Sequence, residues 1–161
     1  MPMTTSEKRT LDVRELRRTL GQFPTGVTVV SYSHGDECYG ATVNSFTSVS
    51  LEPPVILVSL ARSSRAAAMI TGRPFAVNVL RHDHQSVALQ FAGKPQSAAP
   101  IEWDLRGAAP RLRDSVASFC CRPWAVHEAG DHLLVLGLVE EFAYHAGDAL
   151  VFHQGAFKKI N

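Results

Sequence analysis

The sequence GATVNSFTSVSLEPP (residues 40–54) runs into the apolar VILVSL (55–60) and then RSSR (62–65). Small hydroxyl and amide side chains crowd its first part, between two strand-like segments. The two closing prolines have no N–H to donate to a sheet, so the polar loop should end there. The apolar run that follows is typical of a strand buried on both faces. A serine pair and an arginine then stand where a helix should begin.

Upstream of this stretch, the sequence predicts one helix and one hairpin. Asp12 and Glu15 form a capping-box pattern ahead of apolar residues on one helical face, so a helix should run to about Gly21. The next segment is β-branched and apolar, which favours a buried strand, and turn residues at 34–36 lead into a return strand. The two expected strands cover 27–32 and 38–44.

Downstream, short helices interrupt further strands. Ser63 or Ser64 can cap a short helix that Gly72 ends, and Asp83 can cap a second one. Gly-Asp at 130–131 separates two apolar segments as a hairpin. The segments expected to be strands are 75–80, 118–126, 133–142 and a short last strand at 150–153.

These elements bound the fold class and the broad function. Because strands and helices do not alternate strictly, about six hairpin-linked strands favour a mostly antiparallel barrel over a parallel βαβ sheet. At 161 residues and 45% hydrophobic content, the chain can close one core, so we expect a flexible N-terminus (1–10) and a single domain (11–161). The 16 basic residues nearly balance the 15 acidic ones, which argues against binding to nucleic acid or to an anionic membrane. No apolar run approaches the roughly 20 residues of a membrane span, so a soluble cytoplasmic protein is expected.

Several common site types have no signature in this chain. The three cysteines form no Cys-x-x-Cys pair and should remain reduced thiols. The seven histidines include no His-Glu-x-x-His and have no cysteine partner set, so we expect no metal site. The chain also contains no Gly-x-Gly, which excludes a Rossmann fingerprint.

The polar stretch suits an elongated ligand with a phosphate at one end, and a flavin has that shape. Residues 42–54 and the Gly-Asp-His triplet at 130–132 closely resemble the short-chain flavin reductases, the NAD(P)H-dependent partners of two-component flavin monooxygenases. The resemblance covers nearly the whole chain, although Val43 stands where a smaller residue is usual. It implies a mainly β FMN-binding split barrel with short helices, usually a homodimer with flavin sites near the subunit interface.

The same resemblance implies an activity. The reaction would be hydride transfer from NADH or NADPH to FMN or FAD, followed by release of the reduced flavin to a separate monooxygenase. Without a Rossmann fingerprint, the nicotinamide would have to bind on the flavin itself. Two alternatives remain open: a split barrel that keeps its flavin permanently, as an electron carrier or binding module, and an oxidase-like or tetrapyrrole-handling relative.

The resemblance also assigns residues to the cofactor site. Asn44 and Ser45 can offer donors and acceptors to the ribityl chain and pyrimidine edge. Ser63, Ser64 and Arg65 would converge on the phosphate. The complete expected set is Thr25, Gly40, Ala41, Thr42, Asn44, Ser45, Ser59, Leu60, Ala61, Arg62, Ser63, Ser64, Arg65, Phe91, His153, Gln154 and Gly155.

His132 is the one catalytic residue that the resemblance implies. Its imidazole would lie at the mouth of the flavin pocket and orient the nicotinamide carboxamide, with Asp131 fixing the ring tautomer. Gln154 stands where a basic residue is frequent, which leaves recognition of the NADPH phosphate open. Structural explanations also remain open: Ser64 could simply cap a helix, Phe91 could be a core residue and His132 could only end a hairpin.

Overall fold

The computed structural model describes residues 10–96 and 101–160. The helices are α1 (Val13–Leu20), α2 (Arg65–Ile70) and α3 (Gln85–Gln90). The strands of the main sheet are β2 (Thr28–His34), β3 (Glu37–Val43), β4 (Thr47–Leu51), β5 (Pro54–Ala61), β6 (Phe75–Val79), β9 (Ala117–Ala129) and β10 (His132–Tyr144). The strands of two smaller sheets are β1 (Thr25–Gly26), β11 (Leu150–His153) and β12 (Ala156–Lys159), and β7 (Trp103–Asp104) with β8 (Arg111–Leu112).

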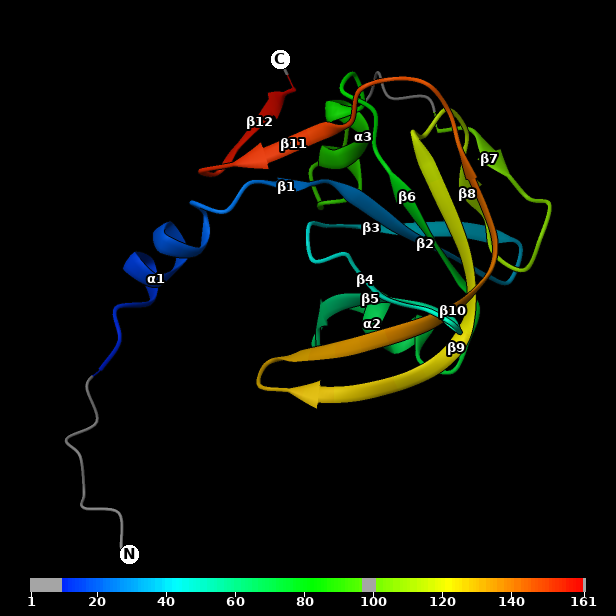
Figure 1. The fold of residues 1–161 in the computed structure, drawn as a ribbon, viewed down its shortest axis with the longest axis horizontal. Coiled ribbons are helices and arrows are strands. Elements are labelled where there is room, and N and C mark those ends of the chain that lie inside the picture. Colours follow the sequence, from blue (N-terminus) through cyan, green and yellow to red (C-terminus); the bar gives the residue numbers. More distant parts are fainter. Residues whose placement is uncertain (1–9, 97–100, 161) are drawn as a thin grey trace, which may run out of the picture.

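The main sheet has seven strands in the order β3-β2-β6-β9-β10-β5-β4. Neighbouring strands pair antiparallel throughout this order. Figure 1 shows how strongly the sheet curls, with the long strands β9 and β10 bending around one side. The edge strands β3 and β4 follow each other in the chain and do not pair, so the barrel stays open between them. The expected antiparallel split barrel is therefore confirmed.

Two apolar clusters lie on opposite faces of the sheet. Val29 and Val30 are both fully buried but belong to different clusters, because successive residues of a strand point to opposite faces. Cys121 belongs to the same cluster as Val30, whereas Cys120 belongs to a third, smaller cluster, and both are free thiols. Burial raises the pKa of the Cys121 thiol to about 12. The prediction that the three cysteines remain free thiols is thus confirmed.

One buried polar residue fastens the small β7–β8 hairpin to the main sheet. The Asn78 side-chain amide donates to the Val29 carbonyl and to the Ser31 hydroxyl, both at 2.9 Å. Its oxygen accepts from the Leu112 N–H at 2.8 Å. All the hydrogen-bonding groups that this buried amide brings into the core therefore find partners, as buried polar groups must.

The expected helix caps differ in outcome. The Asp12 carboxylate accepts hydrogen bonds from the N–H groups of Arg14 and Glu15, which starts α1 as predicted. The prediction for Asp83 is wrong. Its carboxylate pairs instead with the Arg81 guanidinium through two hydrogen bonds of 2.7 and 3.0 Å, and α3 begins after His84 without a side-chain cap.

Five strands were not predicted from the sequence: β1, β4, β7, β8 and β12. β4 lies within the stretch expected to be a polar loop. It is a strand because its main chain pairs with β5 between Thr47 and Leu51. The segment 150–153 is a strand but not the last one. Gln154 and Gly155 both have positive φ, at 53° and 75°, which suits a tight hairpin turn that returns the chain as β12.

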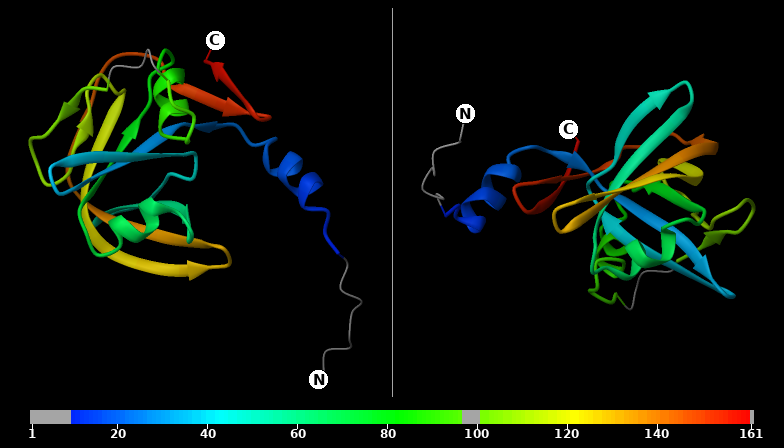
Figure 2. Two further views of the ribbon diagram at one scale, coloured as in Figure 1. Left: turned by 180° about the vertical axis from the view of Figure 1, so that it is seen from behind. Right: turned by 90° about the horizontal axis from the view of Figure 1, so that it is seen from below.

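Helix α1 stands apart from the barrel. None of its residues is buried, and Figure 2 shows it beyond the small sheet of β1, β11 and β12. We call α1 together with this small sheet the arm. The expected flexible N-terminus falls, apart from residue 10, outside the described residues. Within the described part of the chain, no helix combines the length and apolarity needed to cross a membrane.

Candidate functional site

A cleft of about 550 Å³ opens at one end of the barrel. It forms there because the start of β2 meets the ends of β3 and β6: Thr28 pairs with both Val43 and Val79. The expected site residues Thr25, Asn44 and Ser45 all line it. The full lining is Phe23, Pro24, Thr25, Gly26, Thr28, Asn44, Ser45, Phe46, Thr47 and Val79.

The wall of this cleft has polar groups without protein partners. The Thr25 hydroxyl is buried and has no hydrogen-bond partner among the described residues. The Asn44 side chain likewise makes no hydrogen bond within the described chain, although its amide can both donate and accept. Phe46 and Val79 add apolar surface beside them. A flat aromatic ring system with a polar chain, such as a flavin, fits a lining of this mixed kind.

Ser45 is engaged with the protein main chain. Its hydroxyl donates to the Ser59 carbonyl at 2.8 Å and accepts from the Ser59 N–H at 3.0 Å. The β4–β5 pairing ends at Thr47 and Leu57, so this hydroxyl satisfies the β5 main chain beyond the end of β4. Ser45 therefore fixes the cleft wall to β5. Leu60, which follows Ser59 on β5, is buried in the core.

The start of α2 carries the expected phosphate-binding residues. The Ser64 hydroxyl accepts a hydrogen bond from the Ala67 N–H at 3.1 Å. Ser64 therefore caps α2, which is the structural role left open by the sequence. Ser63 is exposed beside it. The Arg65 guanidinium lies over the ring of Tyr39, with its carbon 4.1 Å from the ring centroid. No carboxylate in the described chain lies within ion-pair distance of Arg65.

His132 opens β10 directly opposite Ala61, the last residue of β5. Its Nδ1 lies 2.8 Å from a carboxylate oxygen of Asp131, and this contact lowers the pKa of Asp131. The Arg62 N–H donates to the Asp131 carbonyl at 2.9 Å, while the Arg62 side chain pairs with Glu128 at 3.2 Å. The structure therefore brings His132 and its expected neighbours 61–62 together at the end of the β9–β10 hairpin.

Gly40, Thr42 and Phe91 form a separate contact on the α3 side of β3. A Cβ on Gly40 would lie 2.8 Å from a Val29 methyl and 2.9 Å from the Phe91 ring, so these side chains occupy the space that glycine leaves. The Thr42 N–H donates to the Phe91 carbonyl, and its hydroxyl donates to the Ala88 carbonyl. Phe91 thus packs against β3. Ala41 points to the opposite face, toward the larger core cluster.

The C-terminal residues of the expected set belong to the arm. His153 Nε2 lies 3.1 Å from the Gln22 carbonyl, and the Gln154 side-chain amide donates to the Gln22 side-chain oxygen at 3.0 Å. β11 also pairs with β1, which places Phe152 opposite Thr25. The tight turn of Gln154 and Gly155 is therefore fastened to the segment that follows α1, and the strand before it runs beside the cleft residue Thr25.

The cleft includes residues that sequence reasoning missed. Phe23, Phe46 and Val79 line it, and none was in the expected set. A signal existed for Phe46, since it is the only aromatic residue in an otherwise hydroxyl-rich run. For Val79 there was none, because its place at the cleft depends on the pairing of β6 with β2.

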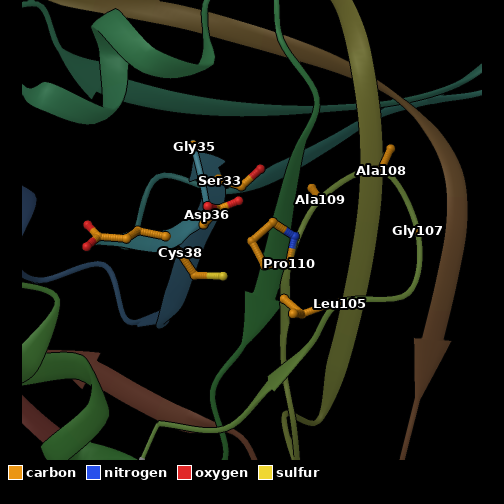
Figure 3. Close-up of a pocket in the computed structure, with 10 residues that line it drawn as sticks. Ser33, Gly35, Asp36, Cys38, Leu105, Gly107, Ala108, Ala109 and Pro110 are labelled. Atoms are coloured by element: carbon orange, nitrogen blue, oxygen red, sulfur yellow. The ribbon is translucent and has the colours of Figure 1, made fainter.

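A second hollow, of about 280 Å³, lies at the opposite end of the β2–β3 hairpin (Figure 3). It lies between the hairpin turn and the segment 105–110, and the Cys38 side chain points into it. Burial raises the pKa of the Cys38 thiol. None of the expected site residues lines this hollow. The complete lining is Ser33, Gly35, Asp36, Glu37, Cys38, Leu105, Gly107, Ala108, Ala109 and Pro110.

Comparison with known proteins gives a consistent result. The family model of the flavin reductase like domain matches residues 20–161. An FMN reductase (NADH), SmoA of Agrobacterium fabrum, is 39% identical over 150 residues, covering 92% of this chain and 86% of the relative. HsaB of Mycobacterium tuberculosis, the reductase subunit of a flavin-dependent monooxygenase, is 38% identical over 137 residues, covering 83% and 73%.

A solved structure extends the likeness to three dimensions. The NADH:FAD oxidoreductase SgcE6 of Streptomyces globisporus, in complex with NAD and FAD fragments, superimposes with a TM-score of 0.84. The two chains are 34% identical, and the match covers 93% of each. The arrangement of strands described above is therefore that of a solved protein which holds both kinds of fragment.

Proposed function

The chain belongs to the family of flavin reductase like domains, and on that premise we propose that it reduces FMN or FAD with a reduced nicotinamide. The reduced flavin then leaves for a separate monooxygenase. The observation that carries this function is the cleft at the barrel end, where a buried, unpartnered Thr25 hydroxyl and the free Asn44 amide meet an apolar wall. The subunit role of HsaB supports the monooxygenase partner.

We assign the expected site residues to three tasks. Thr25 and Asn44 bind polar atoms of the flavin, while Ser45 keeps the cleft wall on β5. Arg65 meets the phosphate, and His132 orients the nicotinamide carboxamide. A bound flavin supplies the hydride acceptor, so the protein needs little acid or base chemistry of its own. Its contribution is to hold donor and acceptor in contact, which removes much of the entropic barrier.

The remaining cofactor binders of the proposed site follow from their surroundings. The main chain from residue 59 to residue 62 runs between Ser45 and His132 and would lie along the ligand. Gly40, Ala41, Thr42 and Phe91 support the strand that leads into Asn44. Ser63 and Ser64 directly precede Arg65, and residues 153–155 follow Phe152, which pairs with Thr25.

We further propose a homodimer that works in the cytoplasm and uses NADH in preference to NADPH. SmoA is an FMN reductase (NADH) and SgcE6 is an NADH:FAD oxidoreductase, which supports NADH. The exposed apolar face of α1 supports a second copy as its cover. The free thiols suit a reducing compartment. Residues 11–161 would form one domain, of which the family model matches 20–161.

Turnover with free flavin tests the proposed activity. Purified protein is mixed with NADH or NADPH and a large molar excess of FMN or FAD, and absorbance of the reduced nicotinamide is followed. We expect many equivalents of NADH to be oxidised per protein, with NADPH slower. Oxidation that stops near one equivalent would instead favour a barrel that keeps its flavin.

A pair of histidine variants tests the role of His132. His132→Ala should raise the KM for NADH several-fold and leave the Kd for FMN unchanged, because the imidazole contacts only the nicotinamide. His145→Ala, an exposed histidine just beyond the other end of β10, is the matched control and should change neither value. An unchanged KM in His132→Ala would remove this residue from the site.

A further inference from the structure

Arg65 is held by an aromatic ring and not by an acid. Its guanidinium lies 4.1 Å from the centroid of the Tyr39 ring. Within the described residues it takes part in no ion pair and no side-chain hydrogen bond. Stacking on a ring uses the flat face of the guanidinium, whereas its five N–H donors point outward in its plane. The contact with the Tyr39 ring therefore leaves the N–H donors of Arg65 free within the described chain.

The Tyr39 ring is itself fixed on two sides. Its hydroxyl donates to a Glu37 carboxylate oxygen at 2.5 Å. Its ring stacks on that of Tyr32, its direct partner across β2 and β3, at 5.8 Å and an interplanar angle of 20°. Tyr32 is only 3% exposed and belongs to the main core cluster. The platform under Arg65 is thus continuous with the core of the barrel.

The same arrangement keeps a competing charge away from Arg65. Glu37 lies on the same strand as Tyr39, and its carboxylate is held by the Tyr39 hydroxyl. A guanidinium bound to a carboxylate would have to break that ion pair before it could meet a phosphate. A guanidinium on an aromatic face has no such pair to break.

We propose that Tyr39 is a positioning residue, which holds the Arg65 guanidinium with its donors free for the phosphate of the flavin. This inference rests on the phosphate role proposed for Arg65. Tyr39 has no contact of its own with the ligand in this account. It acts by restricting a long, exposed side chain to one place before the ligand arrives, which lowers the entropy lost on binding.

Matched variants and two ligands test the proposal. The Kd values of FMN and of riboflavin, which lacks the phosphate, are measured by quenching of flavin fluorescence. An exposed cation–π contact contributes about 0.5–1 kcal/mol, so Tyr39→Leu should raise the Kd of FMN roughly two- to five-fold and leave that of riboflavin unchanged. Tyr39→Phe combined with Glu37→Gln keeps the ring without freeing a carboxylate, and should bind both ligands as the wild type does. Adding Tyr39→Leu to Arg65→Ala should cause no further loss.

A wild-type measurement covers the case in which Tyr39→Leu folds poorly. The Nε–H resonance of Arg65, displaced by the Tyr39 ring, should move on addition of FMN and stay in place with riboflavin. Suppose that Arg65→Ala raises the Kd of FMN more than that of riboflavin, whereas Tyr39→Leu raises neither selectively. This result would overturn the positioning role of Tyr39 alone. Equal losses of both ligands in Arg65→Ala, or an Arg65 resonance that ignores FMN, would overturn the phosphate role and this inference with it. Neither outcome would contradict the proposed oxidation of NADH in the presence of free flavin.

Discussion

The barrel and the arm both contain patterned apolar residues, but only the barrel buries them. In the barrel, apolar strands bury their side chains completely, as Val29 and Val58 do at 0% exposure. In the arm, α1 is capped and amphipathic, yet Leu16 and Leu20 are 44% and 66% exposed. An apolar face that the fold does not cover is typical of a surface that meets another chain. The comparison predicts which residues stabilise this fold and which ones would serve the proposed association.

The largest expected effect is the loss of a barrel side chain. Phe75 is 1% exposed, and its ring lies where a Cβ on Gly137 would come within 2.6 Å. Phe75→Ala should lower the free energy of unfolding by about 3–5 kcal/mol, measured by urea denaturation. Leu20→Ala in the arm is the matched control and should cost less than about 0.5 kcal/mol at concentrations where the protein is monomeric. Similar losses of unfolding free energy in both variants would contradict the distinction between buried barrel residues and exposed arm residues.

The next effect concerns the buried amide that fastens β8. Asn78→Leu removes the partner of the Leu112 N–H and one of the two partners of the Ser31 hydroxyl. A buried polar group left without a partner costs about 1–3 kcal/mol, so urea unfolding should show a loss in that range. Ser33→Ala, on the exposed end of β2, is the control and should be nearly neutral. A neutral Asn78→Leu would mean that the amide does not hold the hairpin.

A substitution on α1 tests association directly. Leu20→Glu places a charge on the exposed apolar face, and we expect the dimer dissociation constant to rise about tenfold or more in sedimentation equilibrium. The free energy of unfolding of the monomer should not change. Arg14→Glu also introduces an acid into α1 and separates a general charge effect from loss of the apolar contact. A dimer that tolerates Leu20→Glu would place the interface elsewhere.

The smallest effect is a pH dependence that belongs to the barrel. Hydrogen bonds from Arg81 lower the pKa of Asp83 to about 2, and Arg106 holds the pKa of Asp104 well below its usual range. A carboxylate whose pKa is depressed on folding adds stability above its ordinary pKa, and this is lost as pH falls through the folded value. Because Asp83 is exposed, its share should stay below about 1 kcal/mol. Asp83→Asn should be less stable than the wild type at pH 6 and match it only below about pH 2.

The sequence predicted the elements whose signal is local. β2, β5 and β6 follow from continuous apolar runs, and the caps at Asp12 and Ser64 follow from residue type. β4 could not be predicted in this way. Its residues are hydroxyl-rich and largely exposed, and only the main-chain pairing with β5, a long-range property, makes it a strand.

The same distinction between local and long-range signals applies to the candidate site. Asn44 and Ser45 were found because their motif is contiguous, and both line the cleft. That the Ser45 hydroxyl is bound to Ser59 depends on where β4 leaves β5, which no local pattern reveals. The filling of the space beside Gly40 by Phe91 depends in the same way on how α3 packs against β3.

The most direct test of the central claim is a crystal structure of this protein soaked with FMN. We predict the isoalloxazine in the cleft at the barrel end, within hydrogen-bond distance of Asn44 or Thr25, and with one face open to a nicotinamide. A flavin bound instead in the hollow beside Cys38, or a cleft closed by the protein's own side chains, would contradict the account.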